Sequence, residues 1–374
     1  MTFSTEDRRY MSRALRLARQ GLYTADPNPR VGAVLVRDGH VLGEGAHRRA
    51  GQGHAERLAL EVAGDARGAC CYVSLEPCAH TGRTGPCAEA LIDAGVARVV
   101  AAMEDPNPRV AGVGLERLRA AGVRVQCGLL EDEARQLNPG FLRRMATGRP
   151  LVRVKLAMSL DGRTAMASGE SRWITGDAAR EDVQRLRARS SAIVTGVGTV
   201  LADEPALTVR PAQWRLAEYG AMPVRQPLRV VVDTGLRTPP QATVISSDGH
   251  CLVAATGEAD DARAAALHAA GAETVRLAAD ERGGVALDAL LDELGHRECN
   301  EVLVEAGPTL AGAVVRAGLA DELVVYMAPV LLGSTARGLL ELDLQRMVER
   351  RNLRLHETRR IGDDMRMTFE PRGS

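Results

Sequence analysis

Along the first part of the chain, segments with the hydrophobic spacing of a helix alternate with short apolar segments typical of strands. A helical spacing puts Met11, Ala14 and Ala18 on one face of an N-terminal helix, with either Ser4 or Thr5 as its cap. Short apolar runs typical of strands then take turns with amphipathic helical segments. The predicted strands are 31–36, 41–45, 69–75, 98–102 and 123–127, and the predicted helices are 54–63, 86–94 and 115–121. This alternation predicts an α/β sandwich.

Turn residues separate these elements. Asp38-Gly39 lies between the first two predicted strands, and an Asp-Gly pair favours the tight turn of a hairpin. Pro86 takes the first position of its predicted helix, and Gly95 follows the end of that helix. The tetrapeptide Asp-Pro-Asn-Pro occurs at 26–29 and again at 105–108, and on its own it predicts only stiff turns.

The pattern restarts near Thr147-Gly148-Arg149-Pro150, so we predict two domains, 1–147 and 148–374. Segments 211–227 and 234–249 are expected to be loops because they are rich in Pro, Gly and polar residues. The predicted strands of the second domain are 151–157, 192–195, 228–232, 251–255, 301–304, 322–327, 353–359 and 365–369, and its predicted helices are 177–189 and 308–317.

Composition narrows the class of protein. The chain has 374 residues, enough for two or three domains at roughly 150 residues each. Hydrophobic residues make up 45% but aromatic residues only 3%, so the cores must be built from Ala, Val and Leu. Lys+Arg and Asp+Glu both number 48, and this balance lacks the basic excess with which proteins bind nucleic acid phosphates. We therefore predict no nucleic-acid partner.

Cysteine usage and hydropathy indicate a compartment. The seven cysteines are an odd number without regular spacing, which favours a reducing environment. The N-terminus is charged and is interpreted as a structural helix, not as a signal peptide. An apolar run of about 18 residues, as a membrane span needs, does not occur. We predict a cytoplasmic protein without a membrane partner.

Four residues predict chemistry in the first domain: His54, Glu56, Cys78 and Cys87. A zinc ion held by one His and two Cys keeps its fourth position for water. A Glu that does not bind the metal can move protons for that water, which is the signature of zinc-dependent deaminases. Side chains two positions apart share a site only where a helix begins, and Gly51 and Gly53 favour such a start. We predict His54, Cys78 and Cys87 as metal ligands and Glu56 as the catalytic residue.

The segment between the two cysteines bears on the substrate. Deaminases of nucleosides and nucleic acids carry Pro-Cys-x-x-Cys, whereas eight residues separate Cys78 from Cys87. These residues are rich in Gly and include Arg83, which suits a charged substrate. They also include His80, which as a fourth ligand would make the zinc site structural.

Three motifs of the first domain together resemble one particular enzyme family. His54-Ala55-Glu56, residues 75–87 and Asp105-Pro106-Asn107-Pro108 closely resemble the bifunctional deaminase–reductase family of riboflavin biosynthesis. The resemblance implies a cytidine-deaminase-like α/β/α domain that converts a diaminopyrimidinone carrying a phosphoribosylamino group into the corresponding uracil. The deaminase substrate residues that the resemblance implies are Asn28, His47, Arg83, Asp105 and Asn107.

The second domain lacks the dinucleotide fingerprint of the Rossmann fold, because Leu201 stands where the third Gly after Gly196 and Gly198 should be. Alone, this Gly pair predicts a strand-to-loop turn. Residues 305–312 follow a predicted strand and lead into a helix. They form either an anion site at a helix start or an ordinary turn.

Several segments of this domain match the reductase half of the same family, at 155–165, 171–175, 196–203, 205–210 and 304–308. The resemblance implies a dihydrofolate-reductase-like fold that uses NADPH to reduce the ribose of the deaminated product to a ribityl chain. The implied cofactor-binding residues are Ala157, Trp173, Thr199, Asp203, Thr234, Gly307, Pro308, Thr309, Leu310, Ala311, Gly312 and Ala313.

The reductase substrate residues follow from the resemblance and from chemistry. They are Lys155, Ser171, Arg187, Leu207, Arg210 and Glu305. Arg187 and Arg210 suit a terminal phosphate, because guanidinium groups pair with phosphate oxygens. Arg187 could instead belong to a solvated helix face. Lys155 and Glu305 either polarise the imine-like carbon of the substrate or form a strand-end ion pair.

Two other functions remain open at this point. One is a tRNA or DNA base deaminase with an unrelated second domain, against which the neutral charge and the few aromatic residues argue. The other is a structural zinc module joined to a nucleotide-binding sensor. If the chain is the deaminase–reductase, we expect small phosphorylated pyrimidines as its partners. We also expect a homo-oligomer, dimer or tetramer, because reductases of this fold often pair through their sheets.

Overall fold

The computed structural model describes residues 2–79, 85–107, 111–210 and 225–372. These residues divide into two compact units, one ending at Gly148 and the other beginning at Arg149. Gly148 ends the last helix of the first unit in a left-handed conformation, with φ of 76°. Each unit has its own sheet and its own apolar cores, and the predicted α/β class is confirmed for both.

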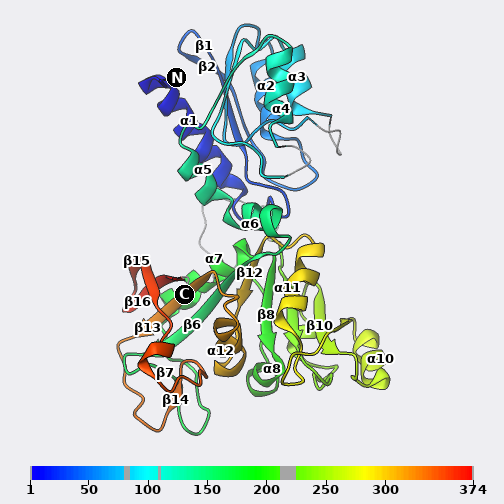
Figure 1. Cartoon of the computed structure of the whole chain (residues 1–374), viewed down its shortest axis with the longest axis vertical. Coiled ribbons are helices and arrows are strands. Elements are labelled where there is room, and N and C mark those ends of the chain that lie inside the picture. Colours follow the sequence, from blue (N-terminus) through cyan, green and yellow to red (C-terminus); the bar gives the residue numbers. More distant parts are fainter. Residues whose placement is uncertain (1, 80–84, 108–110, 211–224, 373–374) are drawn as a thin grey trace. The chain divides into compact units, whose positions relative to one another are not determined.

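The first unit is built on a five-stranded sheet in the order β2-β1-β3-β4-β5 (Figure 1). Its strands are β1 (Gly32–Arg37), β2 (His40–Ala46), β3 (Cys70–Val73), β4 (Arg98–Ala101) and β5 (Arg124–Cys127). Strand β1 is antiparallel to β2 and β3, whereas β3, β4 and β5 are parallel. Asp38 and Gly39 both have positive φ, so the predicted hairpin turn is confirmed.

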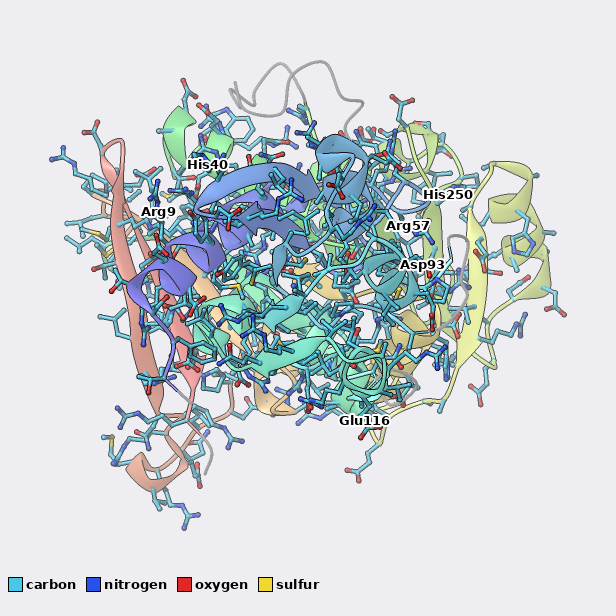
Figure 2. The ribbon with its side chains drawn as sticks, turned by 90° about the horizontal axis from the view of Figure 1, so that it is seen from above. Arg9, His40, Arg57, Asp93, Glu116 and His250 are labelled. Carbon is cyan, nitrogen blue, oxygen red and sulfur yellow. The ribbon has the colours of Figure 1, made fainter. Side chains whose placement is uncertain are left out.

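Helices cover both faces of this sheet. The helices are α1 (Thr5–Ala18), η1 (Arg19–Gly21), α2 (Ala55–Ala63), α3 (Cys87–Asp93), α4 (Val113–Ala120), α5 (Glu131–Leu137) and α6 (Pro139–Thr147). The core on one face takes buried residues from α2, α3 and α4, and the core on the other takes them from α1 and α5. In Figure 2, Arg9 of α1 accordingly lies away from Arg57 of α2 and Asp93 of α3.

One buried carboxylate ties α1 to the sheet. Ser4 is the N-cap of α1: its Oγ accepts from the backbone N–H of Asp7 at 3.0 Å, and its own N–H donates to the Asp7 carboxylate at 2.9 Å. The hydroxyl of Tyr72 in β3 and Nη1 of Arg98 in β4 also donate to Asp7, at 2.8 and 2.7 Å. Burial alone would raise the pKa of Asp7, but the hydrogen bonds from Arg98, Ser4 and Tyr72 outweigh it and hold this pKa well below its usual range.

Asp7→Asn should lower the free energy of unfolding of the first unit by about 1 to 3 kcal/mol at neutral pH, because hydrogen bonds to a charged acceptor are lost. A carboxyl whose pKa is depressed by folding stabilises the protein above its unfolded pKa of about 3.9, and this contribution disappears as the pH falls. The difference between wild type and variant, measured by thermal unfolding, should therefore shrink below about pH 4. A difference that stays constant with pH would contradict this account of Asp7.

The second unit is built on a nine-stranded sheet in the order β11-β10-β9-β8-β12-β6-β13-β16-β15. All neighbours from β11 to β13 are parallel, and β16 and β15 complete the sheet in antiparallel pairing. The strands are β6 (Leu151–Ser159), β8 (Ala192–Gly196), β9 (Leu228–Val232), β10 (Cys251–Thr256), β11 (Glu273–Leu277), β12 (Glu301–Val304), β13 (Glu322–Ala328), β15 (Leu353–Ile361) and β16 (Asp364–Pro371). A separate pair consists of β7 (Arg163–Ala165) and β14 (Arg337–Gly338).

Helices also cover both faces of the second sheet (Figure 1). They are α7 (Asp177–Arg189), α8 (Val197–Asp203), α9 (Thr243–Ser246), α10 (Asp261–Ala269), α11 (Leu287–His296) and α12 (Pro308–Arg316). The short helix η4 (Met347–Glu349) has no buried residue. One core includes Val183 of α7, Val197 of α8 and Leu267 of α10. The other includes Leu291 of α11 and Val314 of α12. No helix in the described ranges has the length and apolarity needed to cross a lipid bilayer.

The structure differs from the sequence-based expectation in a few elements. Pro86 is the N-cap of α3 and not its first helical residue. The Gly196-Val197-Gly198 segment, which alone predicts a turn, opens helix α8. The expected loop at 234–249 contains the short helix α9. Helices α5, α6, α8, α10 and α11 and strands β7, β11 and β14 were not predicted.

Two candidate active sites

The three predicted metal ligands converge in the first unit. His54 is the N-cap of α2, Cys87 is the first residue of α3, and Cys78 lies in the segment after β3. Nδ1 of His54 lies 3.6 Å from Sγ of Cys78 and 3.3 Å from Sγ of Cys87. The backbone N–H of Cys87 donates to Sγ of Cys78 at 3.4 Å. Within the described ranges, no other set of three or more His, Cys, Asp or Glu side chains is arranged to hold a metal.

The spacing of these atoms fits zinc. All three ligand atoms lie within 4.8 Å of one another. A tetrahedral zinc with bonds of about 2.0 Å to nitrogen and 2.3 Å to sulfur holds its ligands about 3.5 Å apart. Hydrogen bonds with Cys87 and His54 lower the pKa of the Cys78 thiol to about 4, whereas the contact with Cys78 raises the pKa of the Cys87 thiol. A bound metal would hold both sulfurs as thiolates. Three protein ligands leave one position open, as in catalytic zinc sites.

Glu56 lies beside these ligands in the first turn of α2 and is only 3% exposed. Burial raises the pKa of its carboxyl to about 7, and the charge of Cys78 adds to this effect. The carboxyl also forms a hydrogen bond with the side chain of Cys87. His54 has extended backbone angles of −72° and 158°, so the helix begins between the two residues and both side chains reach one site.

His47 and Asn28 adjoin His54, one of the predicted metal ligands. The rings of His47 and His54 meet edge to face, with their centroids 5.4 Å apart. Nδ1 of His47 lies 3.1 Å from the carbonyl oxygen of Gly53, and its Nε2 lies 3.0 Å from the amide nitrogen of Asn28. Burial lowers the pKa of His47. A neutral ring that donates from Nδ1 and accepts from Asn28 at Nε2 satisfies both contacts.

The other predicted residues of this pocket are only partly described. Asp105 is 8% exposed, and its Oδ1 accepts from the backbone N–H of Asn107 at 2.8 Å. The backbone N–H of Asp105 donates to the carboxylate of Glu76 at 3.0 Å. Arg83, predicted to bind substrate, and His80, the alternative fourth ligand, lie outside the described residues.

Two glycines of β2 allow α2 to lie directly on the sheet. A Cβ on Gly45 would stand 2.0 Å from the carbonyl oxygen of Ala55, and one on Gly43 would stand 2.2 Å from that of Ala59. Neither position has room for a side chain. The beginning of α2, with His54 and Glu56, is therefore held at a fixed depth against β2.

Gly45→Ala should move α2 away from β2 and weaken zinc binding at least tenfold, because groups that orient a metal ligand typically contribute that much to affinity. Zinc affinity can be measured by competition with a chelator. Gly257→Ala is the matched control, because a Cβ there would meet open space. Equal zinc affinities in the two variants would show that the close approach at Gly45 does not position the metal ligands.

Three predicted cofactor residues gather at one edge of the second sheet. Strands β8, β9 and β12 are parallel, so their carboxyl ends share an edge. Thr199 of α8, Thr234 and Gly307 follow these three strands. Oγ1 of Thr199 accepts from the backbone N–H of Gly307, the N-cap of α12, at 3.2 Å. A helix beginning at such an edge offers backbone N–H groups to phosphate, which fits a dinucleotide.

A largely buried group of charges lies next to this edge, with the side chains of Arg187 and Glu305 13% and 9% exposed. The register of β6 and β12 pairs Val154 with Val304, which brings the following residues, Lys155 and Glu305, side by side. Arg187 of α7 binds the Glu305 carboxylate through two nitrogens, at 2.6 and 2.9 Å. Its third nitrogen, Nη1, donates to the carbonyl oxygen of Thr208 at 3.1 Å. Arg187 is thus not part of a solvated helix face.

Burial and these neighbouring charges change the pKa values of Lys155 and Glu305. Burial lowers the pKa of Lys155, and the neighbouring Arg187 adds to this, while Glu305 opposes it. Burial alone would raise the pKa of Glu305, but the charge and hydrogen bonds of Arg187 outweigh it and the pKa lies below its usual value. The group therefore combines a carboxylate fixed by a guanidinium with an amine that gives up its proton more easily than usual.

Three more predicted residues of the second unit lie in β6 and in the segment before α7. Ala157 lies in β6, and Ser171 and Trp173 precede α7. Trp173 is 69% exposed, with the guanidinium of Arg180 4.5 Å from its ring centroid. Arg172 donates to the carbonyl oxygen of Asp203.

Two further substrate predictions fall on the segment after α8. Leu207 is buried, with φ of 52°, and Arg210 is exposed. The backbone N–H of Arg210 donates to Oε1 of Gln184 in α7 at 2.9 Å. This segment is thus attached to α7 at both Thr208 and Arg210.

Some residues of the segment 307–313, predicted to bind the cofactor, are packed in the protein interior and not at the sheet edge. Thr309 is exposed at the beginning of α12. Ala311 is fully buried in the core, and a Cβ on Gly312 would stand 2.4 Å from the carbonyl oxygen of Glu341. Ala311 and Gly312 therefore pack inward, whereas the residues around Gly307 and Thr309 stand at the sheet edge.

Sequence reasoning gave no role to Glu76 and none to the glycines of β2. Glu76 lies in one of the motifs, and a carboxylate that ends the apolar run from Ala69 to Leu75 was a signal of a buried acceptor. Gly43 and Gly45, two apart on one strand, indicated a close approach by a neighbouring element.

Comparison with known families assigns both halves. Residues 4–103 match the cytidine and deoxycytidylate deaminase zinc-binding region. Residues 150–367 match the RibD C-terminal domain. The first match covers all three predicted zinc ligands and Glu56, and the second covers the edge that carries Thr199, Thr234 and Gly307.

Relatives and solved structures match the chain over nearly its full length. The riboflavin biosynthesis protein RibD of Escherichia coli K12 is 52% identical over 367 residues, which cover 96% of this chain and 98% of that protein. Acinetobacter baumannii RibD (form 1) superposes with a TM-score of 0.90 at 44% identity, covering 98% of this chain and 99% of that one. A Thermotoga maritima diaminohydroxyphosphoribosylaminopyrimidine deaminase/5-amino-6-(5-phosphoribosylamino)uracil reductase superposes with a TM-score of 0.83 at 31% identity, covering 98% of each chain. The chain therefore belongs to the RibD family of riboflavin biosynthesis and is a bifunctional enzyme, with a zinc-dependent deaminase domain followed by an NADPH-dependent reductase domain.

Proposed function

We propose that residues 1–147 deaminate a diaminohydroxyphosphoribosylaminopyrimidine and that residues 148–374 reduce the resulting 5-amino-6-(5-phosphoribosylamino)uracil, the two reactions for which the Thermotoga maritima relative is named. The observation that carries the first half is the meeting of His54, Cys78 and Cys87 beside the buried Glu56. Zinc held by these ligands would lower the pKa of a bound water molecule to about 7 and so would supply the nucleophile.

The side chains of the first unit then handle the protons and the ring. A carboxylate oxygen of Glu56 takes a proton from the attacking water and delivers it to the departing amino group, which leaves as ammonia. Asn28 and His47, fixed to each other and to Gly53, form one wall of the pyrimidine pocket. Asp105 and Asn107, in the segment after β4, bind the substrate as well, together with Arg83.

In the second unit, residues at the carboxyl edge of the sheet would hold NADPH, which would supply the hydride that reduces C1 of the opened ribose. Thr199, Thr234 and Gly307 bind the cofactor, together with the other residues assigned to it from the sequence. Lys155 polarises the carbon that accepts the hydride, and Glu305 orients Lys155. Arg187 is supported as the residue that holds Glu305, because three of its nitrogens are already engaged by protein atoms. Arg210, exposed beside the same segment, is the better candidate for the substrate phosphate.

One experiment tests both halves. The full chain is incubated with the diaminopyrimidine phosphate, ammonia release is measured first, and NADPH is then added to the same tube. We expect ammonia release without NADPH, followed by loss of absorbance at the NADPH band only after deamination has begun. NADPH consumption without prior ammonia release would contradict the proposed order, and no ammonia release at all would contradict the assignment of the first unit.

We also propose a cellular location and an oligomeric state for this protein. We place the protein in the cytoplasm, supported by its seven cysteines, which are all free thiols in the structure. A homo-oligomer is supported by β15, which forms an edge of the second sheet and exposes Leu353 and Leu355. Sedimentation of the full chain would distinguish a monomer from a dimer or tetramer.

A further inference from the structure

Glu76 is a buried carboxylate that the proposed chemistry does not use. It is 3% exposed and lies two residues before the metal ligand Cys78. Its backbone N–H donates to the carbonyl oxygen of Met103 at 3.0 Å, which continues the pairing of β3 with β4. In the described part of the chain, no basic side chain forms an ion pair with it. Its charge must therefore be stabilised in another way, because an uncompensated buried carboxylate is costly.

Four backbone N–H groups fill that role, all from the segment 105–115. Those of Asp105 and Gly112 donate to Oε2 at 3.0 and 2.9 Å. Those of Gly114 and Leu115 donate to Oε1 at 2.8 and 3.2 Å. Three of these donors belong to the beginning of α4, so Glu76 caps this helix from the segment that follows β3 and lies at the positive end of its dipole.

The same segment also approaches Glu76 through its backbone. A Cβ on Gly114 would stand 1.9 Å from the carbonyl oxygen of Pro77 and 3.1 Å from Oε1 of Glu76. Gly112 takes φ of 81°, a left-handed conformation that lets the chain turn into α4. The contact thus requires both the carboxylate and the two glycines. It fixes the segment against the residues that lead directly to Cys78.

We infer that Glu76 is a positioning residue of the deaminase site, which holds the substrate-binding segment of Asp105 and Asn107 at a set distance from the metal ligand Cys78. This inference rests on the proposed function, because it takes Asp105 and Asn107 to bind the pyrimidine. Glu76 itself touches neither substrate nor metal. Its effect should therefore fall on substrate binding, while zinc and the proton-transferring Glu56 remain in place.

Glu76→Gln in the full chain is the direct test. The amide keeps the size of the side chain but replaces one acceptor oxygen by an N–H donor that faces backbone N–H groups. We expect the KM for the diaminopyrimidine phosphate to rise at least tenfold, with a smaller change in kcat and with zinc still bound at one ion per chain. Amide hydrogens of 112–115 should exchange with solvent faster than in the wild type.

Two further variants keep this test decisive. Glu116→Gln makes the same chemical change on the exposed side of α4 (labelled in Figure 2) and should leave KM and zinc unchanged. Gly114→Ala leaves Glu76 intact but forces α4 off Pro77, and it should raise KM as Glu76→Gln does, even if the latter folds poorly.

The outcomes separate this inference from the proposed function. A wild-type KM in both Glu76→Gln and Gly114→Ala would overturn the positioning role while leaving the deaminase assignment intact. Loss of zinc in step with activity would also overturn it, because Glu76 would then serve the metal site. Failure of the wild type itself to release ammonia would instead refute the proposed function.

Discussion

Glu56→Gln is expected to lower ammonia release by about a thousandfold or more while zinc stays bound. A general acid–base group typically contributes between about a hundredfold and ten-thousandfold to the rate. The upper part of this range applies because one carboxyl both removes and delivers the proton. The amide has the size of the carboxyl but can neither accept nor deliver a proton at neutral pH. The predicted ligands His54, Cys78 and Cys87 are not changed.

The measurement is ammonia release by the full chain at saturating substrate, with zinc content determined on the same sample. Glu61→Gln is the matched control, because Glu61 is exposed on the same helix and should behave as the wild type. The NADPH-consuming reaction of the variant, supplied with deaminated substrate, should also be unchanged. Ammonia release within tenfold of the wild type would show that another group moves the proton.

Much of the fold could be predicted because local patterns were strong. Helix α7 and strands β9 and β12 have the bounds expected from the sequence. Helix α10 was missed for a physical reason: its segment Asp261–Ala269 is mostly Ala, so the two faces hardly differ in polarity, and only Leu267 is buried. Helix α11 did carry the signal, in the helical spacing of Leu290, Leu291 and Leu294.

Boundaries set by distant residues could not be predicted. Helix α4 begins at Val113, two residues before its predicted start, because Glu76 from the segment after β3 accepts its first N–H groups. No nearby residue in the sequence indicates such a cap. The same limit applies to the candidate sites. The metal ligands are recognisable from residue type and spacing, whereas the pairing of Arg187 with Glu305 joins residues that are 118 positions apart.

This pairing leads to the second large expected effect. Arg187→Met should lower the free energy of unfolding of the second unit by about 1 to 3 kcal/mol, because the largely buried carboxylate of Glu305 loses the guanidinium that binds both of its oxygens and keeps only Lys155 beside it. It should also abolish NADPH consumption, since Glu305 lies beside Lys155. Ammonia release should persist, because that site lies in the other unit. Calorimetric unfolding of the full chain, with both reactions assayed, gives all three quantities.

The double variant Arg187→Met/Glu305→Gln tests whether Arg187 and Glu305 act as an ion pair or as two independent residues. If the loss in Arg187→Met comes from an unpaired buried charge, neutralising Glu305 should restore part of the stability but none of the reductase activity. If Arg187 instead binds the substrate phosphate, as the sequence alone suggested, the single variant should unfold like the wild type and show only a raised KM. The two readings of Arg187 thus predict opposite results for stability, and because both carboxylate oxygens of Glu305 are engaged by its guanidinium, we expect the first.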